Sequence, residues 1–367
     1  MRIRRTAAVA AAAAMAVGLT GCEPAHPFFV SSTNAGYTVS NGYSPVVGDF
    51  DGDGWDDILF FEPDRWDALW EGRPNGRFAH LSAPAQLDGS YEGTVGDFGG
   101  DATDDVLWTR SDGDDVLWVM QAGGGLASTR AVSLPEASLE TVDNAAGHDT
   151  LLVKTQIGRD VRVWDPDAGT GALTPLAASD PLVTTSGDFD GDGSGDVFLH
   201  RPGGSGDEIA WGDGDATFSI AATTNIGGSY QVHVLRADGD ERDDIAFIDE
   251  QVGHEWALNL WFSEGRTFRR QAFSPLPNRG IYEVHRNHDH NGFDYLVKYT
   301  NGGAFAWSTA PSGTIVSATT PLPGPGTTPA FVGRFHDGLA DDALVYESGG
   351  DHPEAFLRTT DRVQAVP

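Results

Sequence analysis

Short runs of apolar residues separated by turn residues make up most of the chain. Near the start, four such runs cover Pro45–Phe50, Asp57–Phe61, Ala68–Trp70 and Phe78–Leu81, and residues such as Gly, Pro, Asp and Asn separate them. No long stretch places apolar residues at the 3.6-residue spacing of a helix, so the pattern predicts short strands joined by tight turns. The same pattern returns along the rest of the chain, which indicates a repeated unit.

Two sequence markers define the repeat. The first is an aspartate-rich segment, clearest in Gly48-Asp-Phe-Asp-Gly-Asp-Gly-Trp-Asp-Asp57, whose terminal aspartate recurs every 44–50 residues. These terminal aspartates are Asp57, Asp105, Asp149, Asp196, Asp244, Asp294 and Asp342. The second marker ends the third run, at Trp70, Trp118, Trp164, Trp211, Trp261 and Trp307. Four strands per unit at this period are typical of a propeller blade, so we expect an all-β, seven-bladed β-propeller of four-stranded blades with these tryptophans in its core.

We expect one large propeller domain over residues 28–367. Its blade loops are expected near residues 48–57, 96–105, 142–149, 187–196, 235–244, 285–294 and 333–342. The last unit has little chain left for an outer strand, and Phe28–Ser32 can supply that strand instead. Pairing the two ends of the chain would close the ring and leave no exposed sheet edge.

The N-terminus has the pattern of a targeting segment. A basic start, Met1–Arg5, precedes an apolar run, Ala7–Leu19, that is shorter than the about 20 residues needed to span a bilayer. The run leads into Leu-Thr-Gly-Cys22, which resembles the bacterial lipobox, and Cys22 is the only cysteine. The resemblance implies cleavage before Cys22 and lipidation of its thiol. We therefore expect residues 1–21 to be a lipoprotein signal peptide and residues 22–27 a lipidated tether; the alternative is an ordinary secreted protein.

Composition narrows the possible partners. The chain carries 54 Asp and Glu against 23 Lys and Arg, a formal net charge of -31. This excess of negative charge opposes binding to the phosphates of nucleic acid and to anionic lipid surfaces. We therefore expect no nucleic-acid partner and contact with the membrane through the lipid anchor only. An acidic surface favours neutral sugars or basic peptides as ligands.

The aspartate-rich segment is a candidate metal site. In the first repeat, four carboxylates alternate with residues that include two glycines, which allow the backbone to coil around one point. Carboxylates packed this closely repel one another without a cation, and Ca²⁺, which takes about 6–8 oxygen ligands, fits better than Mg²⁺. The segment is not an EF-hand, because Phe60 stands where that loop needs a glutamate and because strands flank it.

The segment Gly-Asp-Phe-Asp-Gly-Asp-Gly-x-x-Asp before an apolar strand resembles the FG-GAP or VCBS repeat. Members of that family form seven-bladed propellers, including the head of integrin α chains, with structural Ca²⁺ between the first and second strands. The resemblance covers about residues 28–367. It implies calcium ligands at Asp49, Asp51, Asp53, the Trp55 carbonyl and Asp57, and at Asp188, Asp190, Asp192, the Ser194 carbonyl and Asp196. Incomplete sets remain at Asp97, Asp101 and Asp105 and at Asp238, Asp240 and Asp244. The alternative for each loop is a plain Asp-Gly turn.

Three loops depart from the family pattern. Gly99 stands in the second loop where an aspartate is expected. Arg236 occupies the first ligand position of the fifth loop, and we expect its guanidinium to neutralise that loop's carboxylates in place of a metal. The seventh loop has Arg334, His336 and Gly338 in ligand positions, so we expect it to bind no metal.

A second regularity predicts a ligand site on the face opposite the calcium loops. Three tyrosines lie five residues before their aspartate segments and a fourth has a similar place, at the start of the innermost strands that surround the channel. Two tryptophans lie in loops expected on the same face. These candidates are Tyr43, Tyr91, Tyr230 and Tyr282, with Trp66 and Trp256. Tyr and Trp suit sugars or peptides because they combine an apolar ring with a polar tip; the alternative is packing between blades.

No motif for a catalytic nucleophile, zinc protease or phosphate-binding loop is present, and no catalytic residue is assigned. We expect a monomeric, extracytoplasmic recognition module, anchored to the bacterial cell membrane, for a glycan or protein ligand at the cell surface. One alternative is a polysaccharide- or lipid-processing lyase or hydrolase, because propellers can gather active-site residues from several blades. A second alternative is a structural component of a surface assembly.

Overall fold

The computed structural model contains 28 β-strands in the part of the chain that it describes. None of the described residues forms a helix long and apolar enough to cross a membrane. The described residues are 29–33, 44–61, 63, 67–83, 85–111, 114–144, 147–155, 160–166, 172–177, 183–203, 206–214, 216–249, 258–273, 282–286, 293–300, 303–309, 315–320, 328–335, 340–346 and 355–359.

The strands form seven four-stranded antiparallel sheets, numbered below as blades in the order of their innermost strands. From the innermost to the outermost strand they are β2 (Ser44–Gly48), β3 (Asp57–Phe61), β4 (Ala68–Glu71) and β5 (Ala79–Ser82); β6 (Glu92–Gly96), β7 (Asp105–Thr109), β8 (Asp115–Met120) and β9 (Leu126–Val132); β10 (Ala137–Val142), β11 (Thr150–Thr155), β12 (Val161–Trp164) and β13 (Leu173–Ala177); β14 (Val183–Gly187), β15 (Asp196–His200), β16 (Glu208–Gly212) and β17 (Phe218–Ala222); β18 (Tyr230–Leu235), β19 (Asp244–Asp249), β20 (Leu258–Ser263) and β21 (Phe268–Phe273); β22 (Tyr282–His285), β23 (Tyr295–Thr300), β24 (Gly303–Thr309) and β25 (Ile315–Thr320); and β26 (Thr328–Gly333), β27 (Asp342–Tyr346), β28 (Ala355–Thr359) and β1 (Phe29–Thr33).

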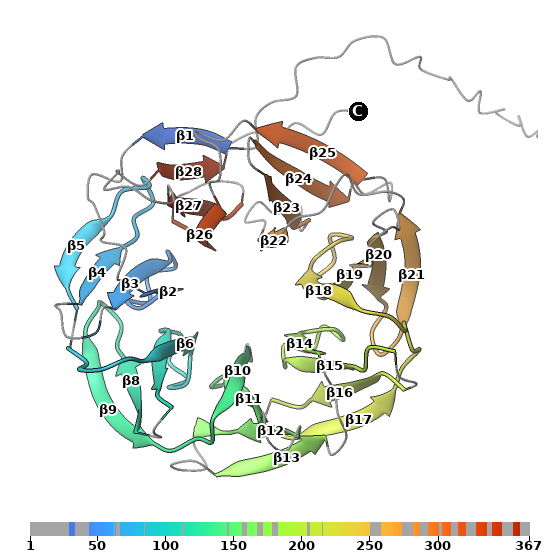
Figure 1. Cartoon of the computed structure of the whole chain (residues 1–367), viewed down its shortest axis with the longest axis horizontal. Coiled ribbons are helices and arrows are strands. Elements are labelled where there is room, and N and C mark those ends of the chain that lie inside the picture. The colour runs from blue at the N-terminus through green and yellow to red at the C-terminus, as the bar shows by residue number, and fades with distance from the viewer. Residues whose placement is uncertain are drawn as a thin grey trace, which may run out of the picture.

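The sheets stand around a central opening, with one innermost strand of each beside the axis (Figure 1). These strands contact one another in a closed cycle, β2, β6, β10, β14, β18, β22, β26 and back to β2. The predicted all-β propeller of four-stranded blades is therefore confirmed. β1 pairs with β28, with Phe29 opposite Thr359, so the N-terminal strand completes the last sheet as the sequence predicted.

The core lies between neighbouring blades. Both faces of the second strands are covered, and all five residues of β3 and of β15 are buried, which is why these strands are continuous apolar runs. Rings from adjacent blades meet directly, as where the Phe61 and Trp108 centroids lie 5.0 Å apart. The six periodic tryptophans are at most 7% exposed, as predicted: Trp70, Trp118, Trp164, Trp211, Trp261 and Trp307.

A reciprocal pair of hydrogen bonds, called here the blade clasp, joins neighbouring blades at the aspartate loops. The Asp49 N–H donates to the Asp104 carboxylate at 2.8 Å, and the Asp104 N–H donates to the Asp49 carbonyl at 2.9 Å. The same clasp joins Asp97 to Asp149, Asp188 to Asp243, Arg236 to Asp294, Arg286 to Asp341 and Arg334 to Asp56. The last pair joins the seventh blade to the first, so the clasp closes the ring together with β1.

The strand register corrects the alignment of two degenerate repeats. The residue pairs at the loop ends are Gly48 with Asp57, Val142 with Thr150 and His285 with Tyr295. Thr150 and Tyr295 therefore occupy the position of the terminal aspartate. Asp149 and Asp294 lie one residue earlier, and they are clasp residues rather than the terminal aspartates that the sequence predicted.

The junction of the third and fourth blades lacks the clasp carboxylate, because Gly195 stands in its place. The Gly195 N–H donates to the Asn144 side-chain oxygen at 3.2 Å. A Cβ at position 195 would lie 2.4 Å from Val142 Cγ1 and 2.5 Å from the Asp143 carbonyl oxygen, which leaves no room for a side chain. Asn144 therefore takes the place of the backbone carbonyl that accepts the equivalent N–H, such as that of Asp104, at the other joints.

Candidate functional sites

The first aspartate loop brings three of its four predicted carboxylates together. Asp49, Asp51 and Asp57 each place an oxygen within 4.8 Å of the other two. The loop also holds itself in shape, because the N–H groups of Asp53 and Gly54 donate to the two Asp49 oxygens at 3.0 and 2.8 Å. Three acceptor oxygens therefore converge on one point, as a hard oxygen-preferring cation requires.

Asp57 forms the floor of this loop and is fully buried. Its oxygens accept the N–H groups of Gly72 at 2.8 Å and of Phe50 at 3.0 Å. Burial raises the pKa of Asp57 to about 8, the charges of Asp51 and Asp49 add to the rise, and the hydrogen bonds oppose it. A buried carboxylate among like charges is the electrostatic situation that a bound cation relieves.

The fourth loop repeats this geometry. Asp188, Asp190 and Asp196 form the second cluster whose oxygens lie within 4.8 Å of one another. Gly193, at φ 85°, donates its N–H to Asp188 at 3.0 Å, in a conformation that side chains rarely adopt. Asp196 is fully buried, and burial raises its pKa to about 7.

The remaining predicted carboxylate ligands of these two loops, Asp53 and Asp192, do not converge with the other three. Asp53 and Asp192 are exposed and lie outside the two clusters. Each accepts the N–H of the residue two positions later, Asp53 from Trp55 at 3.0 Å and Asp192 from Ser194 at 2.8 Å. Both carboxylates therefore shape the turn that carries the predicted carbonyl ligands.

The second loop also fits a cation, although its set is incomplete. Asp97 accepts the Asp101 and Ala102 N–H groups at 3.0 and 2.8 Å, which is the arrangement of the first loop. Asp105 is fully buried, and its Oδ2 has no hydrogen-bond partner among the described residues. A Cβ at Gly99 would lie 3.2 Å from this oxygen. The aspartate that the family pattern expects at position 99 would therefore place its side chain beside Asp105. An orphaned buried carboxylate oxygen is costly, and a bound cation would satisfy it.

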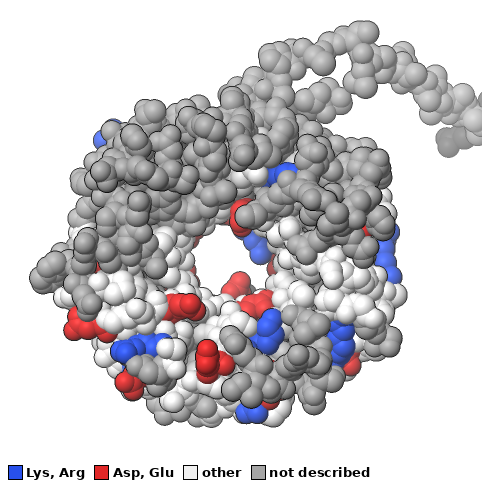
Figure 2. All heavy atoms as spheres, in the orientation of Figure 1, with Lys and Arg blue, Asp and Glu red and all other residues white. Residues whose placement is uncertain are grey.

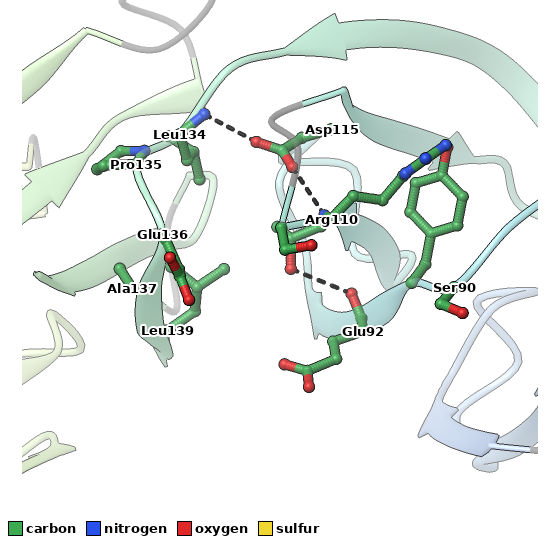
Figure 3. Close-up of a pocket in the computed structure, with 12 residues that line it drawn as sticks. Ser90, Glu92, Arg110, Asp115, Leu134, Pro135, Glu136, Ala137 and Leu139 are labelled. Atoms are coloured by element: carbon green, nitrogen blue, oxygen red, sulfur yellow. Dashed lines mark hydrogen bonds between the residues drawn. The ribbon is translucent and has the colours of Figure 1, made fainter. Parts of the chain in front are cut away.

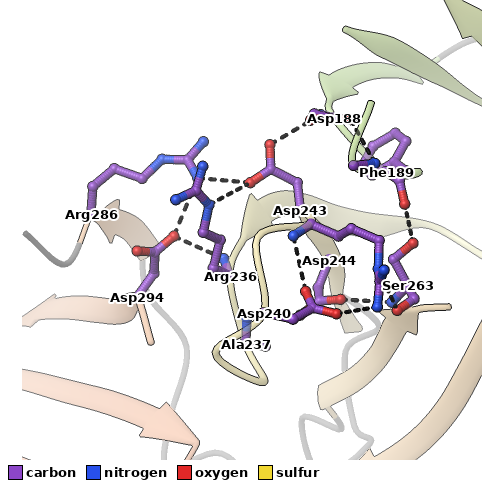
Figure 4. Close-up of polar contacts among 12 residues, drawn as sticks. Asp188, Phe189, Arg236, Ala237, Asp240, Asp243, Asp244, Ser263, Arg286 and Asp294 are labelled. Atoms are coloured by element: carbon purple, nitrogen blue, oxygen red, sulfur yellow. Dashed lines mark hydrogen bonds and ion pairs between the residues drawn. The ribbon is translucent and has the colours of Figure 1, made fainter. Parts of the chain in front are cut away.

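The fifth loop corrects the expectation for Arg236. Its guanidinium does not pair with the three predicted ligand carboxylates of this loop; instead its Nε lies 3.7 Å from Asp243 (Figure 4). Other arginines neutralise the loop, since Arg242 pairs with Asp240 and Arg269 Nη2 lies 3.8 Å from Asp238 Oδ2. The third predicted member, Asp244, is fully buried with a pKa raised by burial to about 8.

A pocket of about 470 Å³ lies between the second and third blades (Figure 3). Tyr91, directly before β6, and Arg110, directly after β7, stand at its wall. The Arg110 Nη1 donates to the Tyr91 hydroxyl at 3.3 Å, and the guanidinium carbon lies 5.1 Å from the centre of the ring. Glu92 and Glu136 add exposed carboxylates, so the pocket combines an aromatic ring, a guanidinium and two acceptors.

A buried aspartate fixes the walls of this pocket. Asp115 is 2% exposed and accepts the N–H groups of Arg110 at 3.0 Å and of Leu134 at 2.8 Å. It therefore ties the two sides of the pocket to the start of β8. Neither this residue nor Arg110 was predicted from the sequence. A signal was present, because an aspartate stands three or four residues before four of the six periodic tryptophans, at Asp67, Asp115, Asp160 and Asp207.

The structure places the other predicted ligand-binding tyrosines, Tyr230 and Tyr282, in different surroundings. Tyr230 begins β18 half-buried, with its ring 5.9 Å from that of Phe247. Tyr282 is only 2% exposed and packs against Trp307, so the prediction of a ligand contact there is wrong, because the ring is part of the core between the fifth and sixth blades. The predicted residues that lie outside the described part of the chain are Cys22, Tyr43, Trp66 and Trp256.

Comparison with known proteins agrees with the repeat and the fold. The FG-GAP-like repeat family model matches residues 49–108, which contain the first two aspartate loops. No curated protein sequence matches the chain. The structure of an Agrocybe aegerita lectin, solved for its recognition of non-reducing terminal N-acetylglucosamine, is similar with a TM-score of 0.60 and 13% identity, over 78% of this chain and 81% of the lectin. BBS1N, solved in complex with ARL6DN, has a TM-score of 0.56 and 12% identity, over 93% of this chain and 99% of that chain. At these identities the likeness shows a propeller scaffold alone, which is compatible with a ligand-binding module.

Proposed function

We propose that the chain is a calcium-stabilised ring of seven blades that binds a carbohydrate in the pocket between the second and third blades. The observation that carries this proposal is the Tyr91 ring, held by Arg110 at a pocket wall that also presents Glu92 and Glu136. A sugar packs its C–H groups on an aromatic ring and its hydroxyls against carboxylates and guanidinium groups. Tyr91 and its neighbours supply each of these partners in one place.

Two further properties support recognition at this pocket. Its volume of about 470 Å³ is within the range of about 300–1,000 Å³ that is usual for small-molecule sites. Its walls are held by backbone hydrogen bonds to Asp115, so little ordering free energy is needed on binding. The lectin that shares the scaffold recognises a terminal sugar, which makes a carbohydrate the first class of ligand to test.

The proposed calcium ions have a structural role. The first and fourth loops would hold one ion each through their three convergent carboxylates, and the second loop a further ion through Asp97, Asp101 and Asp105. A bound ion would neutralise the buried terminal aspartate of its loop. The terminal aspartate also fixes the third strand, because its other oxygen accepts an N–H such as that of Gly72. Calcium would therefore stiffen the blades without contacting the proposed sugar.

The proposed location is the outer face of a bacterial membrane, with a monomer attached through a lipid on Cys22. The support for this part is the basic and apolar leader followed by Leu-Thr-Gly-Cys22 in the sequence. Mass spectrometry of the membrane-extracted protein tests it. A diacylglycerol-modified N-terminal cysteine is expected, and a chain that still carries residues 1–21 in the mature protein contradicts it.

A glycan array tests the binding function. The full chain would be applied to glycans and cell-wall polysaccharides in calcium, together with the variant Tyr91→Ala and the matched variant Tyr230→Ala in the fifth blade. A saturable hit that is lost in Tyr91→Ala and kept in Tyr230→Ala is expected, with both variants folded by their melting curves. A blank array contradicts carbohydrate recognition, and a hit that survives Tyr91→Ala contradicts the pocket.

A further inference from the structure

The first position of the aspartate loops changes from acidic to basic around the ring. This position directly follows the innermost strand of each blade, so its side chains surround the mouth of the channel on the loop face. In blade order the residues are Asp49, Asp97, Asp143, Asp188, Arg236, Arg286 and Arg334. The channel is open, with acidic and basic side chains both present at its rim (Figure 2).

A cavity of about 460 Å³ lies where the acidic part meets the basic part. Four consecutive blades line it with their first loop residues, Asp143, Asp188, Arg236 and Arg286. Its size is in the range of about 300–1,000 Å³ that suits a small ligand. It lies at the ends of the innermost strands, whereas the pocket at Tyr91 lies at their starts, so the two are separate sites.

The two arginines keep unused donors beside this cavity. Arg286 uses a single nitrogen, Nη1, for Asp243 at 3.1 Å and Asp294 at 3.2 Å, and its side chain is 43% exposed. Arg236 reaches Asp243 only through Nε at 3.7 Å, and its side chain is 49% exposed. In the described part of the chain, no group accepts from the remaining side-chain nitrogens of either arginine. Two adjacent guanidinium groups with free edges are suited to a carboxylate, which they can bind through paired N–H donors (Figure 4).

The lining also presents a carboxylate that accepts no hydrogen bond from the described residues. It belongs to Asp143, whose pKa is raised by desolvation and lowered in part by the nearby charge of Arg286. Asp188 differs, because its oxygens accept the N–H groups of Gly191 at 2.8 Å and Gly193 at 3.0 Å. The cavity therefore has two guanidinium donors from the fifth and sixth blades and one available acceptor from the third.

We propose that this cavity binds a small zwitterion, with its carboxylate on Arg236 and Arg286 and its ammonium group facing Asp143. A phosphate or a simple acid fits less well, because four aspartates line the cavity against two arginines and a net anion would be repelled. A ligand that carries both charges and no net charge matches both walls. Free α-amino acids are the simplest members of this class.

Saturation-transfer NMR with the full chain tests the proposal. Free α-amino acids would be added one at a time, each beside its N-acetyl form and its methyl ester. We expect saturable transfer to at least one free amino acid, and at least about ten-fold weaker binding when either charge is blocked. Failure of every free amino acid to bind, or equal binding of the acetylated form, overturns the proposal.

Variants locate the site and separate it from the carbohydrate pocket. Arg236→Gln and Asp143→Asn should each weaken amino-acid binding by about ten-fold or more, because each removes one charge that the ligand faces. Both should fold, since with the described residues Arg236 makes one long ion pair and Asp143 makes none. Arg201→Gln, which removes an arginine paired with Glu208 outside the cavity, and Tyr91→Ala should bind normally. Unchanged binding in Arg236→Gln, or equal loss in Arg201→Gln, overturns the assignment whatever the glycan array shows.

Discussion

The two complete aspartate loops differ in one contact that should set their calcium affinities apart. In the fourth blade, Arg266 reaches across from the fifth blade, and its Nε donates to Asp190 at 2.8 Å. At the first loop, a glycine turn of the second blade occupies this place, and the Gly123 N–H donates to the Asp51 carbonyl at 2.7 Å. Asp190 therefore already has a tethered cation, whereas no described Lys or Arg pairs with Asp51. The fourth loop should therefore bind calcium less tightly than its sequence suggests.

The change Arg266→Gln removes this competing charge. The Asp190 side chain is 9% exposed but that of Arg266 is 56% exposed, so solvent screens the pair and its contribution is about 0.5–1 kcal/mol. Releasing Asp190 should then tighten calcium binding at the fourth loop by about two- to five-fold. The first loop should not respond, because Arg266 does not contact it.

Isothermal titration calorimetry can measure this difference in a background that isolates the fourth loop. Asp51→Asn and Asp101→Asn remove one proposed ligand each from the first and second loops, and Arg266→Gln is compared with Arg266 in that background. Arg270→Gln is the matched control, because Arg270 stacks 4.2 Å from the Trp261 ring centre and makes no ion pair with a described residue. Equal calcium affinity in the Arg266 and Arg266→Gln proteins, or the same gain in Arg270→Gln, would refute the competition. No calcium binding in any form would refute the metal assignment itself.

Three further predictions follow from the loops and the clasp. Chelation should lower the melting temperature in calorimetry, since a ligand at about 100-fold over its Kd adds about 2.7 kcal/mol to native stability; identical curves with and without chelator argue against bound calcium. Asp56→Ala should cost about 1.5–3 kcal/mol in urea denaturation, because it removes the charged acceptor of the Arg334 N–H at the ring closure, whereas Asp88→Ala at an exposed site should cost little. Without calcium, the free energy of unfolding should fall as pH rises from about 4 to about 8. Burial raises the folded-state pKa of Asp57 and Asp244 to about 8 from the ordinary value of 3.8, so the folded state binds more protons than the unfolded state between these pH values. Melting temperatures that stay level or rise over this range in chelator would contradict the last prediction.

The strands and the core tryptophans were predictable from sequence because the same pattern recurs in several repeats. The four runs of the first repeat correspond to β2–β5 within one or two residues, and the periodic tryptophans are all core residues. The register of the degenerate loops was not predictable in this way. When a loop keeps a single aspartate at its end, its sequence does not distinguish the terminal position from the clasp position. In the third loop the pairing of Val142 with Thr150 separates them. Contacts between blades, such as that of Arg266 with Asp190, join residues far apart in sequence and leave no local pattern.

The blade clasp explains why the degenerate third and sixth loops keep an aspartate at the clasp position and not at the terminal position. The third and sixth loops have lost the terminal aspartate, but Asp149 and Asp294 still accept an N–H from the preceding blade. A metal ligand can be lost where the remaining charges are neutralised, as Arg242 neutralises Asp240 in the fifth loop. Loss of a clasp carboxylate instead leaves a backbone N–H without its acceptor at the joint between two blades, which costs free energy in every condition. At the one joint without this aspartate, a different hydrogen bond joins the blades, from the Gly195 N–H to the Asn144 side-chain oxygen. Asn144→Ala should therefore lower stability in urea denaturation by about 1–3 kcal/mol with calcium present or absent, and a loss that disappeared in calcium would show that this joint depends on the metal instead.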